Sequence, residues 1–451
     1  MNESQQFYIN DGVLYHYSGQ GGDVIIPEGI TEIADDAFSN HSGITGISIP
    51  KGCVKIGKNA FENCPALIHI TIPEGVKKIG NHAFRFCSAL TEIVIPNTVT
   101  SIGTGAFAFC DRLTTITLPT GLTRLNDWVF ANCESLTELD IPNRVTRIGD
   151  YAFSGCKSLK KLTLPERLNQ IGSYAFSCCD NLTDITIPEK VSVLSHGAFS
   201  CCGNLRNIVL PENLISLGAH AFVNCTALAS VVLPAGVTAI ESETFCGCTG
   251  LRNIIIPETC TTIAPTAFKG CPGLADENGF VIIRDMLFCY VGNDPEPVVP
   301  KNVKIITPYT FQEQKHLTCV TLPDGIAQID PWTFDKCTQL KCVHIPDSLI
   351  KIGSHAFRNC TELTQLTLPK NLKEIGDHAF SNCSELTQLT LPKNLKEIGD
   401  HAFSNCKQLK RLDIPESIEW IGTAAFSSCP ALEVYIGNRR VDPRAHWMEL
   451  R

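Results

Sequence analysis

The chain has 451 residues, a formal net charge of −9 at pH 7 and a pI of about 5.8. An acidic protein repels phosphate backbones, so nucleic acid is excluded as an expected partner. No apolar run is long enough to cross a bilayer, so we expect no membrane span. The first residues, MNESQQFYIN, lack the features of a signal peptide, which predicts a cytoplasmic location if Met1 is the native start.

The first expected element is a β-hairpin at residues 7–23, FYINDGVLYHYSGQGGD. Two runs of apolar and aromatic residues flank the sequence Asn-Asp-Gly, and Asp-Gly is a favoured two-residue hairpin turn. A stack of repeats needs a cap, because its terminal coil would otherwise expose an apolar end. We therefore predict that residues 1–23 form an N-terminal cap.

From residue 24 the sequence repeats with a period of 23 residues. Each copy carries a proline that is followed eleven positions later by a phenylalanine, as in Pro96 and Phe107. Eleven copies fill residues 24–277 and six fill residues 300–433, which gives 17 repeats. A fixed period of this length is the signature of a solenoid in which each copy forms one coil.

The copy at residues 90–112 shows how one coil is expected to fold. Its segment Leu-x-x-Ile-x-Ile alternates like a strand, and Pro96 then ends the strand because proline has no N–H to donate. Gly103 suits a turn with positive φ, and Ala-Phe-x-x-Cys has the spacing of one tight helical turn that directs Phe107 inward. One coil buries too little apolar surface to offset the entropy of ordering it, so stability must come from stacking.

One interruption divides the repeats. Residues 280–296, FVIIRDMLFCYVGNDPE, align with the initial hairpin without a gap at an offset of 273 residues. We predict that residues 278–299 form a second copy of this hairpin, which projects from a continuous solenoid; the alternative is a bend in the stack. Residues 434–451 leave the repeat pattern and are expected to form a C-terminal cap or tail.

The pattern L-x-x-I-x-I-P-x-x-V-x-x-I-G-x-x-A-F-x-x-C resembles the BspA-type (Treponema-type) leucine-rich repeat over about residues 24–436. Asn126 and Val129 are local departures that replace the glycine and the alanine of one copy. The resemblance implies a leucine-rich-repeat solenoid of the α/β class, mostly β, with right-handed curved stacking and a parallel sheet on one face. It also implies a binding or adhesion protein on the surface of host-associated bacteria, with an export signal outside this chain.

The 23 cysteines fall into two groups. Fifteen occupy the repeat position three residues after the phenylalanine, where stacked side chains about 4.8 Å apart favour buried filler over disulfides. So many free thiols favour a reducing or anaerobic environment. Among the others, Cys178 and Cys201, and likewise Cys319 and Cys342, share positions in adjacent coils. Either pair could oxidise or bind a metal, but we expect solvated or half-buried bystanders.

No catalytic motif is found in the sequence. His355, His378 and His401 recur in three successive coils, where imidazoles could trap zinc. Our preferred interpretation is that each is a solvated residue before a turn. We therefore predict that the protein is not an enzyme and has no cofactor or metal.

The sheet face is the expected contact surface, because residues two and four positions before each proline point outward. Threonine is common two positions before the proline, but three successive coils carry valine or isoleucine with polar neighbours, which resembles the apolar centre and polar rim of a protein contact. The alternative is that valine and isoleucine are simply good strand formers. The predicted partner-binding residues are Val209, Val232, Ile255, Asn207, Asn253, Arg206 and Arg252.

Two functions are consistent with these patterns. The first is a non-enzymatic leucine-rich-repeat binding protein, a monomer or weak oligomer, whose extended sheet face contacts a protein partner or mediates adhesion. The alternative is a structural or self-assembling spacer without a dedicated ligand site. The copies at residues 355–377 and 378–400, which differ at only two of 23 positions, favour this alternative.

Overall fold

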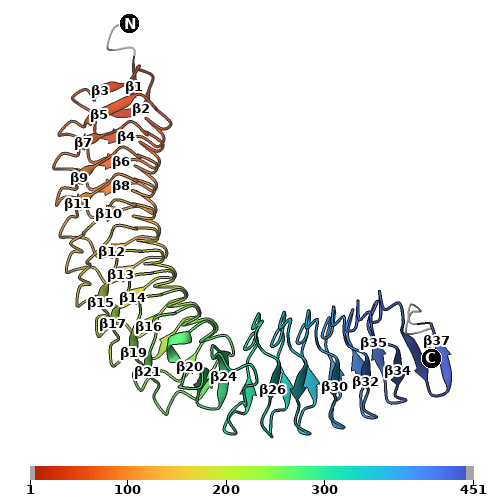
Figure 1. The fold of residues 1–451 in the computed structure, drawn as a ribbon. Coiled ribbons are helices and arrows are strands. Elements are labelled where there is room, and N and C mark those ends of the chain that lie inside the picture. Colours follow the sequence, from red (N-terminus) through yellow and green to blue (C-terminus); the bar gives the residue numbers. More distant parts are fainter. Residues whose placement is uncertain (1–5, 443–451) are drawn as a thin grey trace. The chain divides into compact units, whose positions relative to one another are not determined.

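The computed structural model describes residues 6–442 and divides the chain into two compact units, Met1–Phe268 and Lys269–Arg451. The fold is a β-solenoid of about 18 turns, which confirms the predicted leucine-rich-repeat architecture. Within each unit the turns stack one on another (Figure 1). The one helix within residues 6–442 is the short 3-10 element η2, Pro272–Leu274.

Each regular turn contributes two short strands, which build two parallel ladders. Ladder A contains the strands that precede the repeat proline, and ladder B contains two-residue strands that precede the repeat glycine. The register is offset by one repeat: Ile116 pairs with Ile93 in ladder A, and Ile102 pairs with Ile79 in ladder B. The sequence predicted the strands of ladder A but not those of ladder B.

The strands of unit 1 alternate between the two ladders along the chain. Ladder A contains β3 (Gly22–Ile25), β5 (Ile44–Ser48), β7 (His69–Thr71), β9 (Glu92–Val94), β11 (Thr115–Thr117), β15 (Asp184–Thr186), β17 (Asn207–Val209), β19 (Ser230–Val232) and β21 (Asn253–Ile255). Ladder B contains β4 (Glu32–Ile33), β6 (Lys55–Ile56), β8 (Lys78–Ile79), β10 (Ser101–Ile102), β12 (Arg124–Leu125), β13 (Arg147–Ile148), β14 (Gln170–Ile171), β16 (Val193–Leu194), β18 (Ser216–Leu217), β20 (Ala239–Ile240) and β22 (Thr262–Ile263).

Unit 2 follows the same arrangement. Its ladder A contains β26 (Cys319–Thr321), β28 (Cys342–His344), β30 (Gln365–Thr367), β32 (Gln388–Thr390), β34 (Arg411–Ile414) and β36 (Glu433–Ile436). Its ladder B contains β25 (Ile305–Ile306), β27 (Gln328–Ile329), β29 (Lys351–Ile352), β31 (Glu374–Ile375), β33 (Glu397–Ile398) and β35 (Trp420–Ile421).

The predicted N-terminal hairpin is present. Strands β1 (Phe7–Asn10) and β2 (Val13–Tyr17) pair antiparallel, and β2 also pairs in parallel with β4 of ladder B. The turn residues Asp11 and Gly12 have φ values of 47° and 73°, the left-handed geometry that Asp-Gly hairpin turns require. The Tyr17 ring packs against Phe38 with centroids 5.2 Å apart, so the hairpin covers the apolar end of the first turn.

The second hairpin repeats this arrangement in unit 2. Strands β23 (Phe280–Ile283) and β24 (Met286–Tyr290) pair antiparallel, and β24 pairs in parallel with β25. Tyr290 is fully buried, and its ring centroid lies 5.7 Å from that of Phe311. The expectation that this hairpin projects is therefore wrong, because its apolar side chains belong to the core of unit 2. The boundaries of the repeat blocks stay a prediction.

At the other end of unit 2, β36 pairs in parallel with β34 and antiparallel with β37 (Arg439–Val441). Val434 and Val441 are buried by this last hairpin. Part of the predicted C-terminal cap is therefore a strand pair on the final turn. The rest of it, residues 443–451, lies outside the described residues.

A column of phenylalanines forms the centre of the core. In unit 1 one ring from each turn stacks on the next, from Phe38 to Phe268, with centroids 5.0 to 5.9 Å apart. The residues at the two ends of this column, Phe38 and Phe268, are 1% and 0% exposed. No turn encloses a core of its own, so each ring is buried by the turns before and after it.

The segment around each phenylalanine is not the helical turn that we expected. Two residues per turn have φ near +60°, one two positions before the phenylalanine and one two positions after it, as in Asn59 and Asn63 around Phe61. A left-handed residue interrupts a right-handed helix. Asparagine and glycine recur at these positions because they adopt this conformation at low cost.

The repeat glycine is required by close packing and not by positive φ. Gly103 has no left-handed φ, but a Cβ atom there would lie 2.4 Å from the backbone nitrogen of Asn81 in the preceding turn. Where Asn126 replaces this glycine, its Nδ2 donates a hydrogen bond to the Ile102 carbonyl at 2.5 Å. Backbone contact at this point therefore sets how closely successive turns approach.

Replacing Gly103 with alanine should test this contact. We expect Gly103→Ala to lower the free energy of unfolding by about 1–3 kcal/mol, since the added methyl group must displace backbone. Gly121→Ala is the matched control, because nothing lies within 4 Å of a Cβ there and its φ is not left-handed. The control should leave stability unchanged or raise it by up to about 1 kcal/mol in urea denaturation. Equal effects of the two variants would contradict the close-packing interpretation.

Candidate binding surface

The predicted apolar stripe, which consists of Val209, Val232 and Ile255, lies on three successive strands of ladder A. Val232 and Ile255 are directly paired across β19 and β21, and Val209 ends β17, which contacts β19. The three side chains are 57%, 59% and 53% exposed. The alternation of inward and outward residues along a strand produces this exposure. The stripe is therefore a continuous outward-facing surface.

The predicted rim, which consists of Asn207, Asn253, Arg206 and Arg252, is also exposed. Asn207 donates a hydrogen bond from Nδ2 to Asp184 Oδ1 at 2.6 Å, and hydrogen bonds from Asn207 and Thr183 lower the pKa of that carboxyl group. Neither arginine side chain forms an ion pair with a residue of the described range 6–442. Five of the seven predicted residues lie on the adjacent strands β17, β19 and β21, and Arg206 and Arg252 directly precede β17 and β21. The role of all seven in binding stays a prediction.

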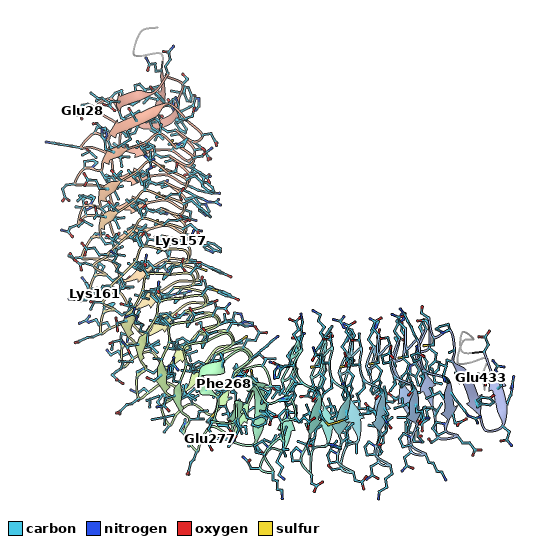
Figure 2. The ribbon with its side chains drawn as sticks, viewed as in Figure 1. Glu28, Lys157, Lys161, Phe268, Glu277 and Glu433 are labelled. Atoms are coloured by element: carbon cyan, nitrogen blue, oxygen red, sulfur yellow. A yellow bond between two sulfur atoms is a disulfide. The ribbon has the colours of Figure 1, made fainter. Side chains whose placement is uncertain are left out.

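Sequence reasoning missed a hollow of ≈ 490 Å³ beside the stripe, which is lined by Lys161, Asp184 and Thr186 among others. Ladder A lacks regular strands between β11 and β15 and continues only through single bridges of Lys161 with Glu138 and Asp184. Lys161 lies on the face of unit 1 that carries ladder A (Figure 2). The sequence feature that could have indicated this hollow is a series of charged residues, each four positions before a proline: Glu138, Lys161 and Asp184.

Sequence reasoning also missed an aromatic column, because it considered only histidines at the position two before the phenylalanine. In unit 1 the rings of Trp128, Tyr151 and Tyr174 stack there, with centroids 4.2 and 5.0 Å apart. All three have φ between 54° and 61°, which costs roughly 1–2 kcal/mol per residue relative to right-handed backbone. Each ring stacks on a neighbour, and these contacts offset part of the conformational cost.

In unit 2 the same position holds Trp332, His355, His378 and His401. Their rings stack in order, with centroids 3.8, 4.8 and 4.8 Å apart. Burial, followed by the charge of a neighbouring histidine, lowers the pKa of His355 and of His378. The expectation of solvated histidines is wrong, because the stack leaves these side chains half-buried.

The cysteine column is buried filler, as predicted. A typical thiol, Cys156, is fully buried and donates a weak hydrogen bond from Sγ to the Phe130 carbonyl at 3.2 Å. Burial raises the pKa of Cys156 to about 12. The Cys156 thiol therefore stays protonated at neutral pH and is a poor nucleophile.

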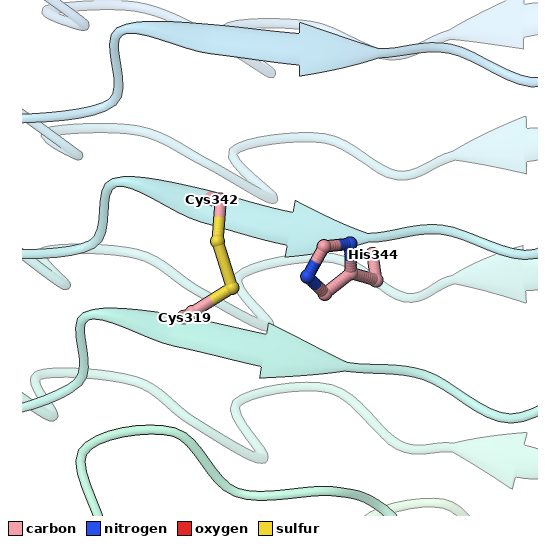
Figure 3. A group of neighbouring side chains, drawn as sticks. All are labelled: Cys319, Cys342 and His344. Carbon is pink, nitrogen blue, oxygen red and sulfur yellow. A yellow bond between two sulfur atoms is a disulfide. The ribbon is translucent and has the colours of Figure 1, made fainter.

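The expectation of bystander cysteines is wrong for one pair. Cys319 and Cys342, paired in register on β26 and β28, form a disulfide, with their Cα atoms 4.7 Å apart. His344 lies beside them on β28 (Figure 3). Cys178 and Cys201, the other predicted pair, are half-buried free thiols, and burial raises the pKa of Cys178 to about 11.

Asp330 is an unusual replacement of the repeat glycine. Asp330 is only 8% exposed, and its Oδ1 accepts a hydrogen bond from Gln328 Nε2 at 2.7 Å. Burial raises the pKa of the Asp330 carboxyl to about 6, and the hydrogen bond from Gln328 opposes this shift. Compared with the unfolded chain, the folded protein therefore holds the proton on this carboxyl up to a higher pH, although the group is mostly ionised at pH 7.

The fold with its exposed strand face defines a leucine-rich-repeat protein. The BspA type leucine rich repeat region matches residues 8–137, 128–250, 216–341, 281–388 and 304–433. The chain therefore belongs to the BspA-type leucine-rich repeat family. No described helix has the length and apolar character that crossing a membrane requires.

Several solved structures are similar to the chain. A leucine-rich repeat protein from Bacteroides ovatus is 27% identical, with a TM-score of 0.47, and the match covers 80% of this chain and 90% of that one. A leucine rich cell surface protein from Faecalibacterium prausnitzii is also 27% identical, with a TM-score of 0.33 and coverage of 96% and 93%. A comparison with curated proteins finds no match.

Replacing Asp330 with asparagine should reveal its burial as a pH-dependent change in stability. The raised pKa means that this carboxyl favours folding below about pH 4 and loses that contribution as the pH rises through about 6. Asp330→Asn stays neutral and should be about 1–2 kcal/mol more stable than the wild type at pH 7. Urea denaturation should show no such difference at pH 4. A difference that is equal at both pH values would contradict the proposed burial cost.

Proposed function

We propose that the chain is a non-enzymatic binding protein at a bacterial surface that uses the ladder A face of unit 1 to hold another protein. The observation that supports this proposal is the exposed apolar stripe with its polar rim. The stripe and rim present methyl groups, amides and guanidinium groups, which suit recognition and include no nucleophile. The surface location rests on family membership and on the description of the F. prausnitzii relative as a cell surface protein.

The stripe alone is too small to hold a partner. Burying the exposed parts of Val209, Val232 and Ile255 contributes roughly 1 kcal/mol for each side chain, at about 25 cal/mol per Å². Association costs at least about 4 kcal/mol in lost translational and rotational freedom. A stable complex must therefore also use the rim and the hollow beside β15.

The chemistry of the rim indicates what the partner offers. Arg206 and Arg252 directly precede the stripe strands β17 and β21, are exposed, and form no ion pair within the described part of the chain. A partner with carboxylates placed around an apolar centre would complement both features. Arginine also forms two parallel hydrogen bonds to a carboxylate, which would fix the orientation of the bound protein.

Replacing Val232 with glutamate should weaken binding without loss of the fold. The side chain is 59% exposed, so we expect unfolding to be unchanged within about 0.5 kcal/mol. Burying an unpaired carboxylate in the contact should weaken the dissociation constant by at least about tenfold. Partners would first be selected from bacterial and host surface proteins and then titrated by calorimetry.

Thr117→Glu is the matched control, because Thr117 occupies the same repeat position on β11, away from the stripe. It should bind with the affinity of the wild type. Equal affinity of the Val232→Glu variant and the wild type would contradict the proposed surface. Filaments or oligomers that form with increasing concentration, without a partner, would favour the structural spacer instead.

A further inference from the structure

We propose that Cys319, Cys342 and His344 form a metal site for a thiophilic ion of the zinc type. The site cannot bind metal while Cys319 and Cys342 form a disulfide, and it becomes able to bind when the disulfide is reduced. The three residues lie on the outward-facing side of ladder A in unit 2. Their candidate ligand atoms all lie within 4.8 Å of one another, which makes them the one such group among the described residues (Figure 3).

The sheet holds these three side chains together independently of the disulfide. Cys319 pairs with Cys342, and Thr321 pairs with His344, across the parallel strands β26 and β28. The Cα atoms of the two cysteines are 4.7 Å apart, which is the ordinary spacing between hydrogen-bonded strands. His344 follows Cys342 by two residues and therefore points to the same face. Reduction would leave this arrangement in place.

The spacing suits a tetrahedral ion. Zinc binds cysteine sulfur at about 2.3 Å and histidine nitrogen at about 2.0–2.1 Å, so the ligand atoms lie about 3.6–3.8 Å apart around it. Once the S–S bond is broken, rotation about the Cα–Cβ bonds can separate the two sulfurs to this distance without moving the strands. Two thiolates and one imidazole leave a fourth position for water or for a group from a partner.

The opening reaction needs a reductant, which we take to be a small-molecule thiol. Two such thiols supply two electrons and two protons, become a disulfide themselves and convert the Cys319–Cys342 disulfide into two thiols. Binding of Zn²⁺ then displaces the two thiol protons, and a neutral imidazole nitrogen of His344 donates its lone pair. Metal affinity should therefore fall as the pH is lowered.

The other cysteines do not compete with this site on equal terms. The column thiols are buried in the core, and burial raises the pKa of a typical one, Cys156, to about 12. Cys178 and Cys201 are the comparable half-buried pair, but no histidine among residues 6–442 completes a group of three ligands with them. They supply the natural control for thiol binding without an imidazole.

The experiment uses the full chain with Cys178→Ser and Cys201→Ser, so that one half-exposed pair remains. The protein is reduced with a phosphine, which does not form mixed disulfides, and is titrated with Co²⁺ as a spectroscopic substitute for Zn²⁺. We expect one equivalent to bind with a sulfur-to-cobalt charge-transfer band that Zn²⁺ abolishes. The oxidised protein should bind at least about 100-fold more weakly.

Two variants test the individual ligands. His344→Ala, at an exposed side chain, should keep the fold, retain thiolate contacts and weaken Co²⁺ binding by at least about 100-fold. Cys342→Ser should abolish the charge-transfer band of a two-thiolate site. His69→Ala, at an exposed histidine on β7 of unit 1, is the matched control and should change nothing. Failure of the reduced protein to bind one equivalent, or an unchanged affinity in His344→Ala, would overturn the proposal.

Discussion

The structure depends on one constraint, the spacing between hydrogen-bonded parallel strands. Every 23 residues the chain returns to the same place one strand further along, so like side chains stack on like. The same spacing brings phenylalanine rings to 5.0–5.3 Å in pairs such as Phe61–Phe84 and places Cys319 and Cys342 within reach of a disulfide. The repeat glycines permit this approach, because a Cβ at Gly103 would meet the preceding backbone.

The repeat made most of the fold predictable from the sequence, because each position in a coil stacks on the same position of the coils before and after it. What failed were local details of backbone geometry. The role of Gly103 was misjudged because a glycine required by close packing against another turn cannot be distinguished in the sequence from one required by positive φ. The turn around Phe107 was misjudged because its spacing fits a helical turn as well as two left-handed residues.

The second hairpin was misjudged for a different reason. Its similarity to residues 7–23 was evident, but sequence alone did not show that Tyr290 would be buried against Phe311 and so close the end of unit 2. The apolar stripe was predictable because alternation along a strand fixes which side chains point outward. The hollow beside β15 arises where the regular strand pairing of ladder A is interrupted. The repeat pattern in the sequence does not predict where such an interruption occurs.

The alternation of buried and exposed residues along ladder A explains why the exposed face can vary from turn to turn. A long ladder that buries alternate residues leaves the others free to vary without cost to the core, as the valines and isoleucine of the stripe, Lys161 and His344 do. Binding groups can therefore change from turn to turn while the stack persists. The three hairpins matter because a stack exposes its core only at an end.

The most direct test of this dependence on neighbours compares two fragments of unit 2, residues 269–451 and residues 300–451. The first retains β23 and β24, which bury Leu287 and Tyr290 against the first turn. It should unfold cooperatively in urea and be more stable than the second by about 3 kcal/mol or more, the scale of losing large buried side chains. Equal stability of the two fragments would contradict the conclusion that the hairpin closes the end of the stack.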